Sequence, residues 1–145
     1  MDTKFLEKLV ERGESQKIEF KKTTGQLRRA FETLCGFLNS NSDGGWVIFG
    51  VSDEAKMTGQ EVSDSTLQEI SHEMERLEPF NDTNLEVIES AEGVYFLVIE
   101  ANPKNNEVYV YDGRPFKRVE TTTRIMDQRE YKQELLSYND KENWE

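Results

Sequence analysis

Glu14, Glu19 and Lys21 have the residue types and the spacing of a site that handles a divalent cation and a phosphate. The segment 16–21 alternates between charged and apolar side chains, which predicts a half-buried strand. On such a strand Glu19 and Lys21 project from the same face, and a turn of the chain would bring Glu14 beside them. Two or three carboxylates hold hard cations such as Mg²⁺ or Mn²⁺, and a neighbouring lysine stabilises charge that develops on a phosphate. The same pattern is also common on the solvent-facing side of an ordinary strand.

A second segment with functional potential runs from Gly44 to Asp53. Its apolar run over 46–51 predicts a strand near the centre of a sheet. The glycine pair before this run suits positive φ or a close backbone approach, and Gly50 suits a backbone or a ligand that lies close. Asp53, at the end of the strand, can reach a site beside Glu19. The alternative is that the glycines serve packing and Asp53 begins a turn.

The charge of the chain is unevenly distributed. The net charge is −11, yet residues 17–29 carry five basic side chains against one acidic, and residues 114–132 carry six against three. Nucleic-acid binding depends on cations that neutralise phosphates, so these two segments are the candidate contacts. An ordinary solvated surface would give the same clustering, and the acidic remainder of the chain opposes binding to a polyanion. The candidate nucleic-acid contacts are Lys21, Lys22, Arg28, Arg29, Lys117, Arg118 and Arg124.

The periodicity of apolar residues predicts an α+β domain. Residues 39–45, rich in asparagine, serine and glycine, predict a loop, and Asp112-Gly113 predicts a hairpin turn between the last two strands. We therefore expect one mixed sheet of about six strands with three to four helices packed on it. The expected helices are 3–12, 26–38, one from 64 or 65 to just before Pro79, and one from 126 or 127; the expected strands are 16–21, 46–51, 85–89, 94–101, 107–111 and 116–119.

The length and composition of the chain indicate one soluble domain. Its 145 residues fit a single core, which we expect at 1–136, followed at 137–145 by a polar tail or linker toward a missing C-terminal domain. The chain begins with charged residues rather than a signal peptide, and no apolar run is long enough to cross a membrane. One cysteine cannot form an intrachain disulfide, so we expect a cytoplasmic location. We expect Cys35 in the core and His72 exposed, which favours neither a zinc site nor a Ser-His-Asp triad.

Four motifs, in this order, resemble the Schlafen-type Alba-like domain, formerly called the divergent AAA domain. They are Glu14-Ser-Gln-Lys-Ile-Glu19-Phe-Lys21, Phe37-Leu-Asn39-Ser, Gly44-Gly45-Trp-Val-Ile-Phe-Gly50-Val-Ser-Asp53 with Gly59 after it, and Phe116-Lys-Arg118-Val-Glu-Thr-Thr-Thr123-Arg124. The resemblance implies a domain that binds DNA or RNA at the N-terminus of transcriptional regulators or RecG-related ATP-dependent helicase-like proteins. Some animal members are metal-dependent RNases, and the resemblance carries their carboxylate triad onto Glu14, Glu19 and Asp53.

The sequence departs from the family pattern in two places. Asn41, Ser42 and Asp43 lengthen the loop before the glycine pair. Glu120 stands where the family has glycine, which adds negative charge beside Arg118. The sequence has neither a Gly-x-x-x-x-Gly-Lys-Ser/Thr loop nor a Gly-x-Gly-x-x-Gly motif, so we expect no ATP site in this chain.

Three functions from different classes fit these observations. The first is binding of DNA or RNA without catalysis, which we rank highest. The second is a metal-dependent endoribonuclease, in which Glu14, Glu19 and Asp53 bind Mg²⁺ or Mn²⁺ and Lys21 assists. The third is protein interaction or homo-oligomerisation through exposed aromatic side chains on the strands. The candidate aromatic residues are Tyr95, Tyr109 and Tyr111.

Overall fold

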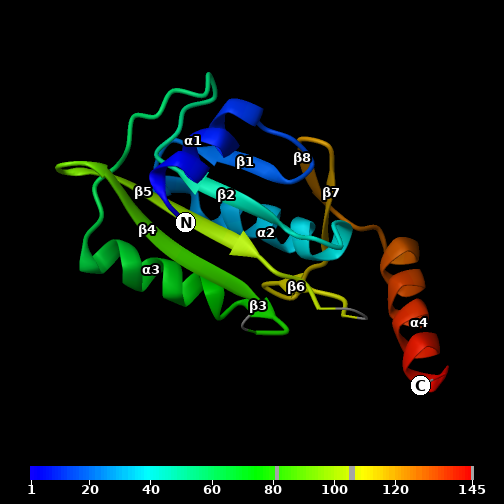
Figure 1. Cartoon of the computed structure of the whole chain (residues 1–145). Coiled ribbons are helices and arrows are strands. Elements are labelled where there is room, and N and C mark those ends of the chain that lie inside the picture. The colour runs from blue at the N-terminus through cyan, green and yellow to red at the C-terminus, as the bar shows by residue number, and fades with distance from the viewer. Residues whose placement is uncertain (81, 105–106, 145) are drawn as a thin grey trace.

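A four-stranded mixed sheet forms the centre of the computed structural model, which describes residues 1–80, 82–104 and 107–144 (Figure 1). β1 and β2 are parallel, whereas β5 is antiparallel to both of its neighbours. The expected α+β class and the central positions of β2 and β5 are confirmed. The strands lie in the order β1 (Ile18–Lys21), β2 (Gly45–Phe49), β5 (Val94–Ala101) and β4 (Thr83–Ala91).

Helices cover both faces of the sheet because its central strands are apolar on both sides. Successive side chains of a strand point to opposite faces. On one face, α1 (Thr3–Arg12) shares a core with Ile48 of β2. On the other face, α2 (Leu27–Ser40) and α3 (Asp64–Met74) share a core with Val47. Helix α2 therefore lies between the four-stranded sheet and the short strands formed by residues 110–125.

Two residues that resemble catalytic groups lie where the sequence predicts. Cys35 is on the buried face of α2, and burial raises the pKa of its thiol to about 12. A thiol that stays protonated at neutral pH is a poor nucleophile, so Cys35 acts as a core residue. His72 is exposed on α3, as expected.

The strands outside the central sheet pair differently from the expected hairpin. Asp112-Gly113 does turn the chain, with a backbone bridge between Tyr111 and Arg114. The segments on either side of the turn, however, belong to different two-stranded ribbons, so the hairpin prediction is wrong. The expected sheet of about six strands is instead a four-stranded sheet with two ribbons beside it. The ribbons are β3 (Leu77–Glu78) with β6 (Val110–Tyr111), and β7 (Phe116–Val119) with β8 (Thr122–Ile125).

Asn39 explains why the hairpin does not close. Its Nδ2 donates to the carbonyls of Tyr109 and Phe116, both at 2.8 Å, and its Oδ1 accepts from the Tyr109 N–H at 2.8 Å. A ladder across the turn would pair these same backbone groups with one another. The amide of Asn39 thus replaces that ladder, and α2 continues through Asn39 to Ser40, where a loop was expected.

Helix α3 begins as expected but ends before Leu77. Ser63 caps its first turn in a capping box with Thr66. Leu77, which was expected on the helix, pairs with Tyr111 in the β3–β6 ribbon and is buried there. Burial of Leu77 against α2 in the ribbon therefore outweighs the helical periodicity of the segment.

The aromatic side chains of the third hypothesis are mostly internal. Tyr109 and Tyr111 are 0% exposed. The Tyr109 hydroxyl donates to Asp82 at 2.6 Å, and the Tyr111 hydroxyl donates to Glu73. The prediction that Tyr109 and Tyr111 form an exposed interface is therefore wrong. Homo-oligomerisation through another surface stays a prediction.

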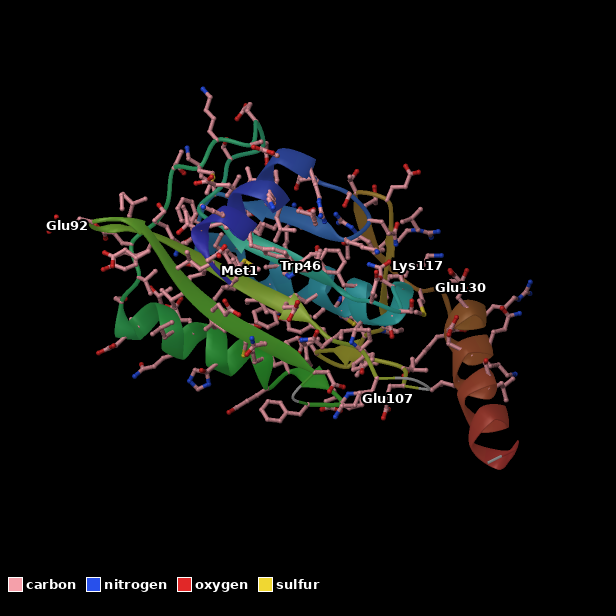
Figure 2. The ribbon with its side chains drawn as sticks, viewed as in Figure 1. Met1, Trp46, Glu92, Glu107, Lys117 and Glu130 are labelled. Atoms are coloured by element: carbon pink, nitrogen blue, oxygen red, sulfur yellow. The ribbon has the colours of Figure 1, made fainter. Side chains whose placement is uncertain are left out.

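Helix α4 (Gln128–Trp144) extends away from the other elements (Figure 1). Residues 137–144, expected as a frayed end or a linker, continue this helix along the backbone. An ion pair between Lys117 of β7 and Glu130 joins β7 to the first turn of α4 (Figure 2). Within the described ranges, no helix has the length and apolar character needed to span a bilayer.

Candidate functional site

The candidate site forms at the outer edge of β1, which is the edge strand of the four-stranded sheet in the described part of the chain. Gly13, at φ 78°, ends α1 and turns the chain back toward the strand. The Glu14 Oε2 accepts from the Phe20 N–H at 3.0 Å, and the Arg118 guanidinium donates to the Ile18 carbonyl at 3.3 Å. Two side chains thus satisfy backbone groups that a further strand would otherwise pair.

A cavity of about 500 Å³ opens beside this edge. Three carboxylates and three cations line it, so the local charge is nearly balanced in an otherwise acidic protein. They come from the segment before β1, from β1, from the turn after it, from α2 and from the loop after β2. The lining residues are Glu14, Glu19, Phe20, Lys21, Lys22, Thr23, Gln26, Arg29 and Asp53.

The cavity brings together residues that the sequence predicted separately. Alternation along β1 buries Ile18 and Phe20 and leaves Glu19 and Lys21 at the cavity, as expected. The four proposed catalytic residues line one cavity, and so do three of the seven proposed nucleic-acid contacts. The sequence did not reveal Thr23 and Gln26, which are the N-cap and the last residue of the short helix η1 (Thr24–Gln26). The Thr-Thr-Gly turn was the available signal for this segment.

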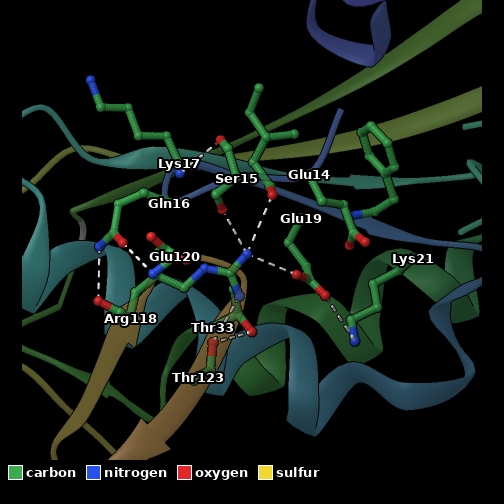
Figure 3. A network of polar contacts seen from close by, with 12 residues as sticks. Glu14, Ser15, Gln16, Lys17, Glu19, Lys21, Thr33, Arg118, Glu120 and Thr123 are labelled. Carbon is green, nitrogen blue, oxygen red and sulfur yellow. Dashed lines mark hydrogen bonds and ion pairs between the residues drawn. The ribbon is translucent and has the colours of Figure 1, made fainter. Parts of the chain in front are cut away.

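Glu19 is held by two cations (Figure 3). Its Oε1 lies 2.9 Å from the Arg118 Nη2, and its Oε2 lies 3.7 Å from the Lys21 Nζ. The Arg118 Nη2 also donates to the Ser15 carbonyl at 2.8 Å, and its Nη1 donates to the Thr123 Oγ1 at 3.1 Å. The closer and better directed of the two ion pairs is the one with Arg118.

Arg118 faces the interior of the protein. It is 3% exposed, and its guanidinium carbon lies 5.2 Å from the centre of the Phe37 ring. The guanidinium that we expected among the phosphate contacts is therefore bound to internal acceptors. The alternation of the segment was a usable signal, because Arg118 lies two residues after the buried Phe116 and shares its face of β7.

The β7–β8 hairpin is fastened to the segment before β1. Gln16 donates from Nε2 to the Arg118 carbonyl at 2.8 Å and to the Asn41 Oδ1 at 2.9 Å, and its Oε1 accepts from the Glu120 N–H. Glu120 forms the turn at φ 55°, a left-handed conformation that glycine adopts without strain. This backbone geometry is one that would suit the glycine implied at this position by the family resemblance.

The carboxylates suit a hard cation in chemistry but do not share one ligand set. Among the residues that the structure describes, no group of three or more His, Cys, Asp or Glu side chains is arranged to hold a metal ion. One Glu19 oxygen is bonded to Arg118, and one Glu14 oxygen is bonded to the Phe20 N–H. Binding of Mg²⁺ or Mn²⁺ by Glu14, Glu19 and Asp53 stays a prediction, and it requires these side chains to rearrange.

The remaining basic candidates lie outside the cavity. Arg28 pairs with Asp112 at 3.2 Å beside a neighbouring cavity between α2 and α3. Lys117 pairs with Glu130, and Arg124 is exposed opposite Lys117 on the β7–β8 hairpin.

Lys22 and Arg29 are more exposed than Lys21, the third cation of the cavity. Both are exposed, whereas Lys21 is half-buried beside Glu19. In the described part of the chain, neither Lys22 nor Arg29 has an ion-pair partner. A cation without a protein partner can bind a ligand phosphate without first breaking an ion pair.

Glu14→Gln is expected to leave the protein at least as stable as the wild type at neutral pH. Burial raises the pKa of Glu14 above its usual value, and the nearby charges of Glu19 and Asp53 raise it further. A carboxyl with a raised pKa stabilises the fold below the unfolded value of 4.5 and loses this contribution as the pH rises through the folded pKa. Glutamine carries no charge, and its oxygen can still accept from the Phe20 N–H.

Urea unfolding at neutral pH and below 4.5 measures this effect. The stability of Glu14→Gln relative to the wild type should decrease on acidification. Glu11→Gln, an exposed change on α1, is the control and should show no such trend. The assignment would be contradicted if the stability of Glu14→Gln relative to the wild type were lower at neutral pH than in acid.

Two solved structures share this fold. One is the crystal structure of the DIP2311 protein from Corynebacterium diphtheriae, with 18% identity and a TM-score of 0.57 over 80% of this chain and 27% of that one. The other is the solution structure of the N-terminal domain of a RecG-related protein from Nitrosomonas europaea, with 18% identity and a TM-score of 0.54 over 79% of this chain and 88% of that one. At this identity the likeness shows the fold alone.

The chain spans 27% of the length of the DIP2311 protein. No curated protein sequence matches it significantly. The family model described as Schlafen, AlbA_2 matches residues 14–127, which include β1, the cavity and the β7–β8 hairpin. The chain therefore belongs to the Schlafen AlbA_2 family.

Proposed function

We propose that this domain binds DNA or RNA at the cavity beside β1, with phosphates contacting Lys22 and Arg29. The observation that carries the proposal is the convergence of Lys21, Lys22 and Arg29 on one cavity, where two of the three cations have no ion-pair partner among the described residues. Phosphate oxygens are the natural ligands of such cations, and neutralising phosphates supplies most of the affinity for a nucleic acid. The balanced charge of the cavity makes it a region where a polyanion can approach an acidic protein.

The relatives support the same proposal. The family resemblance implies nucleic-acid binding, and one structural neighbour is the N-terminal domain of a RecG-related protein, a name that refers to a DNA helicase. We place this domain accordingly as the N-terminal module of a longer protein, either a transcriptional regulator or a RecG-related helicase-like protein. The acidic remainder of the domain repels nucleic acid, so binding is local, restricted to the cavity, and strongest at low salt.

Removing the two unpaired cations is expected to weaken binding sharply. Lys22→Gln and Arg29→Gln should each lower the affinity for single-stranded oligo(U) or oligo(dT) about tenfold, because each removes a charge-assisted contact. Each should also reduce the slope of log affinity against log salt by about 0.7. Fluorescence anisotropy with labelled oligonucleotides over a salt series measures both quantities.

Lys8→Gln is the matched control for these two changes. Lys8 is an exposed cation on α1 and does not line the cavity. It should leave the affinity and the salt slope unchanged. Wild-type protein that binds neither oligonucleotide at low salt would refute the proposed function, and equal losses in all three variants would refute the assignment to the cavity.

A metal-dependent nuclease is the second candidate. The favouring observation is that Glu19 and Asp53 lie near enough to Glu14 to raise its pKa, so that carboxylates of three segments converge beside Lys21. As arranged, these carboxylates do not form a three-ligand set within the described residues, so we derive no metal-dependent step.

Structured RNA incubated with Mn²⁺ or Mg²⁺ separates the two candidates. We expect binding to persist in EDTA and no cleavage above background, because Glu19 is already neutralised by Arg118 and Lys21. Cleavage that requires Mn²⁺ and disappears in Glu14→Gln would reverse this order and make the domain a nuclease.

A further inference from the structure

A chain of polar contacts joins the β7–β8 hairpin to the cavity. The Thr33 Oγ1 on α2 lies 3.0 Å from the Thr123 Oγ1 on β8, and the Thr123 Oγ1 accepts from the Arg118 Nη1 at 3.1 Å (Figure 3). Arg118 then pairs with Glu19, and Glu19 pairs with Lys21 at the cavity. Four elements are thus linked through one arginine.

The position of Arg118 is fixed independently of Glu19. Thr123 lies directly opposite Arg118 in the β7–β8 register, and the backbone N–H of Arg118 donates to the Ser40 Oγ at 2.9 Å. Its Nη2 also reaches the carbonyls of Ser15 and Ile18. A guanidinium held at so many points offers a fixed cation to which the Glu19 side chain adjusts, rather than the reverse.

The charges explain what this fixed cation does for the cavity. The side chain of Arg118 is 1% exposed, and Glu19 is its one carboxylate partner among the described residues. Separating the two would leave a buried charge without compensation, so Glu19 stays with Arg118. Lys21, at 3.7 Å, is the looser partner and can turn to a ligand at little cost. Without Arg118, Glu19 would pair with Lys21 alone among the described cations. The charge of Lys21 would then be neutralised by Glu19 and would no longer be available to a ligand.

We propose that Arg118 is a positioning residue of the cavity, which holds the Glu19 carboxylate from inside the fold so that Lys21 stays available to a phosphate. The inference rests on the proposed binding of nucleic acid at this cavity. It gives the second basic segment a role in binding without contact, because the charge of Arg118 acts on the ligand through Glu19 and Lys21.

A double-mutant cycle between Glu19 and Arg118 tests the inference. Arg118→Met is expected to weaken binding of labelled oligo(U) about tenfold, since Glu19 then captures Lys21. The double variant Glu19→Gln/Arg118→Met should recover most of this loss, because glutamine carries no charge to hold Lys21. A residue that only supports the fold would not be rescued by removal of the Glu19 charge.

The outcomes separate this inference from the proposed function. Wild-type protein that fails to bind oligo(U) or oligo(dT) at low salt refutes the proposed function and, with it, the availability of Lys21 to a phosphate. The unfolding free energies of the wild type, Glu19→Gln, Arg118→Met and the double variant still report whether Arg118 and Glu19 are coupled. If the effects of the two single changes on stability simply add in the double variant, the positioning itself is refuted. Wild-type binding with an unchanged Arg118→Met, or with no rescue in the double variant, refutes the inference alone.

Thr123→Val provides a test that does not require the protein to fold without the Arg118 side chain. Valine keeps the shape of threonine but removes the contacts to Arg118 and Thr33, so binding should weaken about threefold. Thr122→Val, an exposed neighbour on the opposite face of β8, is the matched control and should bind like the wild type. Equal behaviour of the two valine variants would overturn the role of the hairpin.

Discussion

Gly44→Ala is expected to lower the free energy of unfolding by more than about 4 kcal/mol, which is a large part of the stability of an ordinary domain. Gly44 has φ 75°, and a Cβ atom at this position would lie 1.8 Å from the carbonyl oxygen of Ala101. That oxygen belongs to the backbone of β5 and cannot move without disturbing the β2–β5 ladder, where Gly45 pairs with Ala101. The close backbone approach predicted from the Gly44-Gly45 pair is therefore present, and it excludes any side chain.

Gly93→Ala is the control for this prediction. Gly93 has a similar φ of 77°, but a Cβ atom there would meet nothing within 4 Å. The change should cost about 1 kcal/mol, which is the cost of the left-handed conformation alone. Urea unfolding followed by circular dichroism measures both variants. Similar losses in the two would show that φ, and not the contact with Ala101, sets the requirement for glycine at position 44.

Asn39→Ala is expected to lower the free energy of unfolding by about 3 kcal/mol. The change removes the hydrogen bonds of Asn39 to the Tyr109 N–H and to the Tyr109 and Phe116 carbonyls. The Tyr109 carbonyl keeps the weaker contact from the Cys35 thiol at 3.5 Å. Each buried backbone group left without a hydrogen bond costs about 1–3 kcal/mol. New hydrogen bonds to water, or directly between Tyr109 and Phe116, would offset part of this cost. The loss should also free the segment that contains β6 and β7 from α2.

Asn102→Ala is the matched control for Asn39→Ala. Asn102 is exposed, and among the described residues its side chain donates to Glu100 alone, at 3.2 Å. Its replacement should change stability by less than about 0.5 kcal/mol. Hydrogen exchange of the Tyr109 amide provides a local readout, because this amide should exchange much faster in Asn39→Ala than in the wild type. An unchanged Tyr109 exchange rate would contradict the role assigned to Asn39.

Local pattern determined a large part of this fold. The alternation along β1 predicted that Ile18 and Phe20 are buried and that Glu19 and Lys21 share the other face, and both predictions are confirmed. Gly13 predicted the end of α1. Burial with a period of two or 3.6 residues is a property of neighbouring positions, so a single sequence contains it. The grouping of Glu14, Glu19 and Asp53 around one cavity was instead expected from the family resemblance, and the three residues do line one cavity.

Tertiary contacts decided the remainder. The contact that fixes Glu19 comes from Arg118, 99 residues further along the chain, and the side chain that prevents the expected hairpin comes from Asn39, 70 residues before Tyr109. In both cases a polar side chain takes a partner that no local pattern reveals, because the free energy of a buried charge or backbone group depends on which segments surround it. Sequence therefore indicated several of the residues that meet at the cavity of β1, Glu14, Glu19 and Asp53 among them. Only the folded structure decided that Lys22 and Arg29 face it without an ion-pair partner among the described residues, and that Arg118 lies beneath it, bonded to Glu19.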